Sequence, residues 1–432
     1  MNGSGKKRLS PTIGYLFTGL TACAVGFGVS AASLSTWSES IAGTPVSLAA
    51  IHTLVLGGLL TIAAGVLFQV VSIAFQAPPL PRHVALWHLP IHAVSVVMMV
   101  LGFALGDWRL VGAGGVLLTA GLIAYGAFLA KSYRLARNKT HVHRLLWLPA
   151  AFFAWVVAAG LWQAFSPATE TPSLLLTHVA AGSLGFWVGL VMIISYKFIP
   201  MFTLSHGYEV SSAKTAAWWF GGLAAVIISQ APAIFTWGGG LAPATQMLMR
   251  ALTVAGCLAS FAGIMLFAAD AWRVLAARKR RALVKPMRSA LLALSVALVA
   301  ASLALAAISF DSRRSGFLAG FLLLFGGLLP LAFSYVQKIV PFLWFEYRFS
   351  HRPERKTAPG LDEMVPANWI ATAAWLYAAS FASGLARMSG WLPRSTGLVL
   401  SFAFGGCGVL SVATLMLALY RVLRIGGPRP TD

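Results

Sequence analysis

The sequence predicts an all-α polytopic membrane protein with about 12 transmembrane helices. Hydrophobic residues make up 58% of its 432 residues and charged residues only 10%. The mean hydropathy is +0.80, and long apolar stretches recur along the whole chain. Soluble domains carry roughly 25% charged residues. We therefore expect the lipid bilayer to be the main partner of this chain.

Each apolar stretch is long enough to cross a membrane, because a spanning helix needs about 20 residues. The connections between the stretches are too short to hold a separate soluble enzyme domain, so we expect a single transmembrane domain over residues 1–432, with any chemistry among the helices. The expected helices are 11–33, 46–75, 84–105, 108–131, 143–165, 173–202, 212–235, 243–270, 288–309, 315–345, 366–386 and 395–422.

Basic residues are concentrated in alternate connections, for example at 131–144 and 273–288. Short loops rich in Lys and Arg stay in the cytoplasm. We therefore expect a multi-pass protein of the inner (cytoplasmic) membrane with both termini cytoplasmic. The net charge of +21 then reflects topology, and it does not indicate nucleic-acid binding.

Three of the expected helices resemble one another. The helices at 173–202 and 315–345 both carry Lys-x-x-Pro near their ends, at Lys197 and Lys338, and the helix at 46–75 shares a histidine followed by glycines with the first of them. These helices are four apart in the chain. The spacing predicts three pseudo-repeats of four helices, at about 11–131, 143–270 and 288–422.

Two histidines are expected at membrane depth. His52 and His178 each lie about one and a half turns inside the outer end of a helix, which predicts a similar depth for both. Ionisable groups there are costly and are candidates for function. Neutral imidazole ligates heme iron, copper or zinc. The alternative is that both rings are core histidines hydrogen-bonded to neighbouring carbonyls or hydroxyls.

His88 and His92 form a second candidate metal site. They are four residues apart, on one helical face, with Pro90 between them. Histidine pairs at this spacing bind transition metals, although no thiolate or carboxylate accompanies them. The alternative is that both are solvated or contact lipid headgroups.

Further polar residues and the motifs that the sequence lacks reduce the number of function classes to consider. We expect Lys197 and Lys338 to extend to the membrane interface, or to contact an anionic cofactor group or a proton path. Asp270 and Arg273 are three apart and are expected to pair. The sequence has no phosphate loop, nucleophile elbow or acidic pair, so hydrolases and ATPases have no support. The three cysteines show no paired spacing.

Taken together, the helix number, the common side of the termini, the repeat and the two outer histidines resemble the catalytic subunit I of the heme-copper oxidase superfamily. The stretch from His178 to Phe202, with Lys338-Ile339-Val340-Pro341-Phe342, resembles small oxidase-like membrane proteins of bacteria. In this superfamily a helix 2 histidine ligates the low-spin heme, which implies His52 as a ligand of heme b. A helix 6 histidine ligates copper, which implies His178.

The chain departs from the superfamily at the remaining ligands. A histidine pair on helix 7 and two histidines on helix 10 are absent from 212–235 and 315–345. The resemblance therefore implies a divergent oxidase-like protein without a complete binuclear centre. The expected function is heme or metal binding in respiratory electron transfer or nitric oxide and oxygen handling, with a respiratory electron-transfer partner and a possible oxidoreductase activity. The alternatives are a cofactor-free transporter, in which the Lys-x-x-Pro elements break two helices, and an assembly partner of a respiratory complex.

Overall fold

The fold is known from a computed structural model that describes residues 9–34, 44–166, 172–236, 240–279, 282–349, 358–389 and 394–426. Twelve helices in these residues are long and apolar enough to cross a membrane, which confirms the predicted all-α fold class. In the same residues the only extended pairing is a single bridge between Ser205 and Arg278.

Several spanning helices consist of two or three consecutive segments. In chain order the elements are α1 (Thr12–Ser33), α2 (Pro45–His52), η1 (Thr53–Leu60), α3 (Thr61–Ala74), α4 (Arg82–Leu105), α5 (Trp108–Arg134), α6 (His141–Leu145), α7 (Trp147–Phe165), α8 (Pro172–Ala180), η3 (Ala181–Val188), α9 (Gly189–Thr203), α10 (Ser212–Ser229), α11 (Ala231–Phe235), α12 (Pro243–Ala276), α13 (Lys285–Ser309), α14 (Arg313–Phe321), η4 (Leu322–Leu328), α15 (Leu329–Arg348), α17 (Ala367–Ser389) and α18 (Arg394–Val422).

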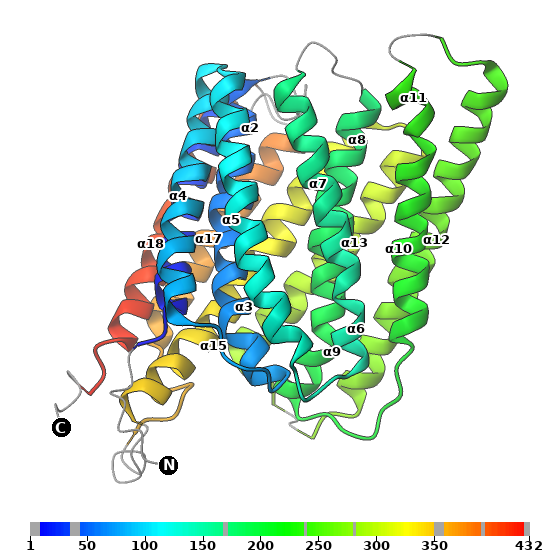
Figure 1. Cartoon of the computed structure of the whole chain (residues 1–432). Coiled ribbons are helices and arrows are strands. Elements are labelled where there is room, and N and C mark those ends of the chain that lie inside the picture. The colour runs from blue at the N-terminus through cyan, green and yellow to red at the C-terminus, as the bar shows by residue number, and fades with distance from the viewer. Residues whose placement is uncertain are drawn as a thin grey trace.

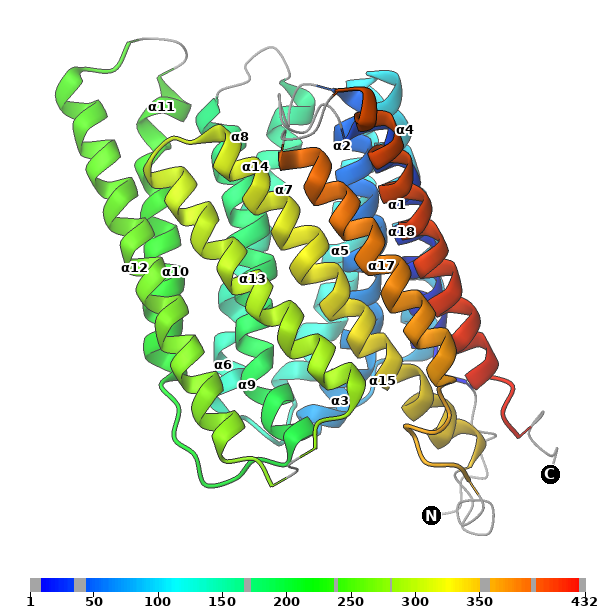
Figure 2. The same ribbon diagram turned by 180° about the vertical axis from the view of Figure 1, so that it is seen from behind.

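Helices that follow one another pack as hairpins. α4 packs on α5, α10 on α12, and α17 on α18, while α1 packs on α18 and so joins the two ends of the chain (Figures 1 and 2). Small residues permit the close contacts: a Cβ added at Gly222 of α10 would lie 2.4 Å from the carbonyl oxygen of Gly256 on α12. Such approach through small residues is typical of helix pairs in membranes.

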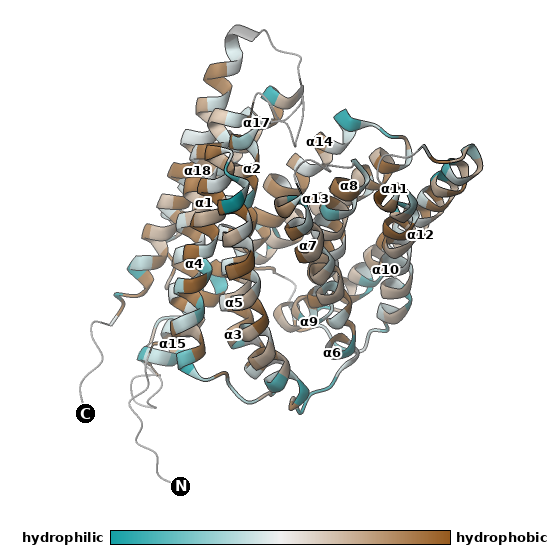
Figure 3. Ribbon diagram, turned by 45° about the horizontal axis from the view of Figure 1, so that its top comes forward, coloured by the Kyte–Doolittle hydropathy of each residue, from teal (hydrophilic) through white to brown (hydrophobic). Residues whose placement is uncertain are grey.

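Both described ends of the chain lie at the same end of the bundle. Leu9 and Ile425 belong to one apolar cluster, and Arg82 donates to the carbonyl of Leu9 (Figure 1). We call this the termini end. Residues 1–8 and 427–432 lie outside the described residues, and the cytoplasmic placement of the termini stays a prediction. Apolar residues dominate the sides of the bundle, and hydrophilic residues gather toward its ends (Figure 3).

Three spanning helices widen into a π-helix near the middle of the bundle. These wide segments are η1, η3 and η4. A π-helix closes its backbone hydrogen bonds one residue later than an α-helix, and it often marks a functional site. The three wide segments fall in the three helices that the predicted repeat places in equivalent positions. Superposition of the repeats stays a prediction.

A glycine occupies the fifth position of each wide segment, at Gly57, Gly185 and Gly326. Each one is packed against a neighbouring helix. An added Cβ would lie 2.2 Å from Phe152 at Gly185 and 2.7 Å from Val296 at Gly326. Glycine is therefore needed at these positions for close packing of the wide turns.

The Lys-x-x-Pro elements do not break their helices. Pro200 lies inside α9 and Pro341 inside α15, so the predicted breaks are wrong. A proline removes one backbone donor, and packed neighbouring helices tolerate this loss in a membrane bundle. Lys338 forms an ion pair with Asp362.

Candidate functional site

The structure places His52 and His178 at the same end of the bundle. His52 is the last residue of α2, and His178 lies in α8, so both are at the end of the bundle opposite the termini end (Figure 1). The two imidazoles come from different helices. Each ring is half-buried.

The ring of His52 is fixed by its own helix and by α4. Its Nδ1 donates to the carbonyl oxygen of Leu48 at 2.8 Å. The ring also packs on Phe103, with 4.5 Å between the ring centres. These two contacts set the orientation of the imidazole.

The ring of His178 is fixed by α7. Its Nδ1 donates to the carbonyl oxygen of Val156 at 3.0 Å. Gly160, one turn along α7, leaves room for the ring, since a Cβ there would lie 3.1 Å from the Cε1 atom of His178. A side chain at this position would displace the imidazole.

Both rings leave their second nitrogen free. A carbonyl oxygen only accepts, so each Nδ1 carries the proton and each Nε2 carries a lone pair. Within the described residues neither Nε2 has a hydrogen-bond partner, and neither is sealed inside the protein. Metal-ligating histidines have this arrangement, in which a carbonyl holds one ring nitrogen and the metal binds the other. The donor set therefore fits heme iron or copper.

The two histidines differ slightly in their position relative to the wide segments, and their similar depth in the membrane stays a prediction. His52 is one residue before η1, whereas His178 is three residues before η3. Counted from the wide segments, they are therefore offset by about 3 Å along the helix axis. The sequence could not show this offset because the wide segments set the register.

His88 and His92 lie in the interior of the bundle, with exposed fractions of 0% and 2%. The alternative that they are solvated or contact lipid headgroups is therefore wrong. They lie on one face of α4, which continues through Pro90, with 5.5 Å between the ring centres. The apolar helices around them exclude water from both rings.

Each of these rings has one nitrogen bound and one without a partner. Nδ1 of His88 is hydrogen-bonded to the hydroxyl of Tyr15 at 2.7 Å, and Nε2 of His92 donates to the carbonyl of Leu56 at 3.0 Å. Tyr125 stacks on His88 with 4.3 Å between ring centres. Nε2 of His88 and Nδ1 of His92 are buried, and neither has a hydrogen-bond partner among the residues that the structure describes.

Aromatic side chains fill the regions where further oxidase ligands would lie. Phe321 of α14 and Phe325 of η4 are fully buried against Phe404 of α18. On α10, Trp219 is fully buried and would contact a Cβ added at Gly263. These regions are packed, so they do not replace the absent histidines.

A buried carboxylate near the termini end links three helices. Asp270 of α12 accepts from Arg273 at 2.9 Å, which confirms the predicted pair. It also accepts from the hydroxyl of Tyr196 and the backbone N–H of Ser211, each at 2.8 Å. Sequence reasoning missed Tyr196 and Ser211 because their contact with Asp270 depends on helix packing.

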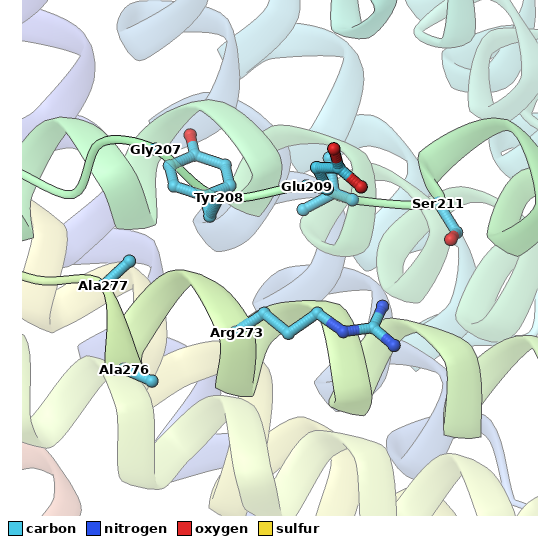
Figure 4. Close-up of a pocket in the computed structure, with 8 residues that line it drawn as sticks. Gly207, Tyr208, Glu209, Ser211, Arg273, Ala276 and Ala277 are labelled. Carbon is cyan, nitrogen blue, oxygen red and sulfur yellow. The ribbon is translucent and has the colours of Figure 1, made fainter.

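A pocket of about 660 Å³ opens beside this network (Figure 4). Partial burial raises the pKa of Tyr208, and the Arg273 side chain is 56% exposed. The pocket is on the order of 35 Å from His178 along the helix axis, so it is separate from the histidine pair. Its lining residues are Gly207, Tyr208, Glu209, Val210, Ser211, Arg273, Ala276 and Ala277.

Within the described residues no group of three or more His, Cys, Asp or Glu side chains is placed to hold a metal ion. A structural zinc site uses four protein ligands, and a catalytic one uses three. Among these residues the remaining candidates are sites built from two imidazoles.

No protein-family model matches the chain, and no curated protein matches it. The findings therefore support the coarser part of the resemblance, an all-α membrane protein with 12 helices able to span a bilayer.

Proposed function

We propose that the protein is a heme- or metal-binding integral membrane protein in which His52 and His178 are the ligands. One observation carries this proposal: at the same end of the bundle two imidazoles from different helices each have Nδ1 held by a carbonyl and Nε2 without a hydrogen-bond partner in the described residues. A bound ion or heme would satisfy both nitrogens.

The proposed cofactor is heme b, with copper as the second choice. Either group, when bound, would accept and release an electron. A heme held by only one of the two imidazoles would also offer a position to a diatomic gas. The chain supplies the imidazoles, orients them through Leu48 and Val156, and leaves room through Gly160. The oxidase histidines expected at 212–235 and 315–345 are absent. The proposed role is therefore electron transfer or nitric oxide and oxygen handling, with a respiratory partner in the inner membrane.

The absorption spectrum of the purified, full-length protein tests this proposal. We expect a Soret band in stoichiometric amount and loss of heme or metal in His52→Ala and His178→Ala. A shift of that band when carbon monoxide is added to the ferrous protein would show that only one of the two imidazoles is an axial ligand. His83→Ala is the matched control, because His83 is exposed on α4. Pure protein without heme or metal, after growth with both, would contradict the proposal.

The transporter alternative required helices that are broken at the Lys-x-x-Pro elements. Both helices continue through their prolines, so the structure lacks the feature on which this alternative depends. The assembly alternative has no specific contact in its favour. We therefore propose no second function.

A further inference from the structure

The His88 and His92 pair is the most unusual polar feature away from the proposed site. Two imidazole nitrogens in the same small region of α4 are buried and have no partner in the described part of the chain. Unpaired buried polar atoms are rare in folded proteins and call for an explanation, such as an ion or water. The two rings are part of one cluster with Tyr15 and Tyr125, which we call the α4 histidine cluster.

We propose that the α4 histidine cluster binds one copper(I) ion through Nε2 of His88 and Nδ1 of His92. This site is separate from the one proposed at His52 and His178 and does not depend on it. Imidazole nitrogen lies about 2.0 Å from a bound metal. Two rings with 5.5 Å between their centres are near enough to share one ion.

The hydrogen bonds of the cluster are those of ligating histidines. Nε2 of His92 donates to the carbonyl of Leu56, so its Nδ1 carries a lone pair. Nδ1 of His88 contacts the hydroxyl of Tyr15, which can donate or accept. When the ion binds Nε2 of His88, the ring proton moves to Nδ1 and is donated to the Tyr15 oxygen. Both rings stay neutral, and no proton is released.

Charge selects copper(I) over a divalent ion. The cluster has two neutral ligands, and the described residues hold no group of three metal-ligating side chains. A divalent ion would bring two uncompensated charges into a water-free interior, which is costly. Copper(I) brings one charge, is stable with two nitrogen ligands, and imidazole suits copper. The stacked Tyr15 and Tyr125 rings exclude water from His88.

Anaerobic titration of the full-length, detergent-purified protein with copper(I) tests the proposal, using a chromophoric copper(I) chelator as competitor. We expect one tightly bound ion whose binding does not depend on His52 or His178. His88→Phe keeps the ring volume between the tyrosines, and His92→Gln keeps a donor for Leu56; each should lose the ion. His83→Ala, on the same helix and exposed, should keep it.

Tyr15→Phe is the second, milder variant, because it removes only the hydroxyl that orients His88. Loss of such an outer partner typically weakens metal affinity about 10–100-fold. We expect this loss of copper(I) affinity in Tyr15→Phe. The unfolding temperature of the copper-free variant should stay within a few degrees of the wild-type value. X-ray absorption at the copper edge should show nitrogen ligands without sulfur.

The His52→Ala/His178→Ala double variant separates this site from the proposed function. It should keep the copper(I) ion while losing the Soret band. Absence of bound copper(I) in the wild-type protein would overturn the inference and leave water as the occupant. Copper that stays bound in both His88→Phe and His92→Gln would also overturn it. Copper lost only in the double variant would also overturn it. In each case the Soret band reports on the proposed function independently.

Discussion

The wide segments η1 and η4 have the same backbone and different chemistry. His52 comes directly before η1, and Phe321 comes directly before η4. Both segments carry glycine at the fifth position, at Gly57 and Gly326. Nε2 of His52 has no hydrogen-bond partner in the described residues, whereas the Phe321 region is filled by phenylalanine rings. The wide backbone occurs beside either kind of side chain, so any ligand chemistry would come from the side chain and not from the wide turn.

The same comparison extends to the carbonyl groups of the two segments. The fourth residue of each, Leu56 in η1 and Phe325 in η4, offers its carbonyl to a donor on the next helix of the bundle. His92 donates to the first and the hydroxyl of Tyr377 to the second. A wide turn leaves backbone carbonyls that need a partner in a water-free interior. Either side chain meets this need, and only histidine leaves a further nitrogen available.

The largest effect on stability is expected at the phenylalanine-filled segment. Phe321→Ala removes a fully buried ring that contacts Phe325, Phe381 and Phe404, and should lower the free energy of unfolding by about 3–5 kcal/mol. The heme or metal content per folded protein should not change. Thermal unfolding in detergent and the absorption spectrum measure the two quantities. Loss of cofactor in Phe321→Ala would show that the two regions are not chemically distinct.

The next effect is expected where α7 contacts His178. Gly160→Val places side-chain atoms against the ring and should cost about 1–3 kcal/mol through overpacking, with loss of bound heme or metal. Gly126→Val on α5 is the matched control, because no atom lies within 4 Å of its added Cβ. Cofactor content is read from the spectrum and from elemental analysis. Full cofactor content in Gly160→Val would argue against ligation by His178.

Much of this fold follows from the sequence, because hydrophobic length and charge decide which segments span a bilayer. The expected segment at 84–105 corresponds to α4 at Arg82–Leu105, for example. The wide segments do not follow from hydropathy, since an α-helix and a π-helix of the same residues are equally apolar. Neither does the continuation of α9 through Pro200, which depends on neighbouring helices.

The sequence predicts which histidines are candidate ligands, and it does not predict which side chains surround them. His88 and His92 at four-residue spacing indicate one helical face, and the structure has that face. Their burial depends on Tyr15 of α1 and Tyr125 of α5, which contact them only after packing. The partner of His178 likewise comes from another helix, at Val156. Periodicity fixes which residues share a helix face and leaves the facing helix unspecified.

A smaller effect is expected from the donor to η4. Tyr377→Phe removes the hydrogen bond to the carbonyl of Phe325 and keeps the ring. Hydrogen bonds between membrane helices contribute about 0.6 kcal/mol on average and at most about 1.7. We expect a loss in this range, measured by unfolding in detergent. Tyr335→Phe is the matched control, since in the described residues its hydroxyl makes no hydrogen bond. Equal effects of both variants would show that the η4 carbonyl does not need this donor.

The smallest effect is expected at Gly320, and its sign carries the information. Gly320 is exposed on α14, next to Phe321, and no atom lies within 4 Å of an added Cβ. Gly320→Ala should therefore stabilise the protein by up to about 0.5–1 kcal/mol, because alanine loses less backbone freedom in a helix.

Gly326→Ala, six residues later, should destabilise it instead, since its Cβ would lie 2.7 Å from Val296. Thermal unfolding of the two variants compares them directly. The Val296→Ala background separates two reasons for the glycine at Gly326. If glycine is needed there mainly because the chain adopts the wide turn, Gly320→Ala should be neutral, and Gly326→Ala should be as destabilising in the Val296→Ala background as in the wild-type protein. If close packing is the reason, as the contacts indicate, Val296→Ala should relieve part of that cost.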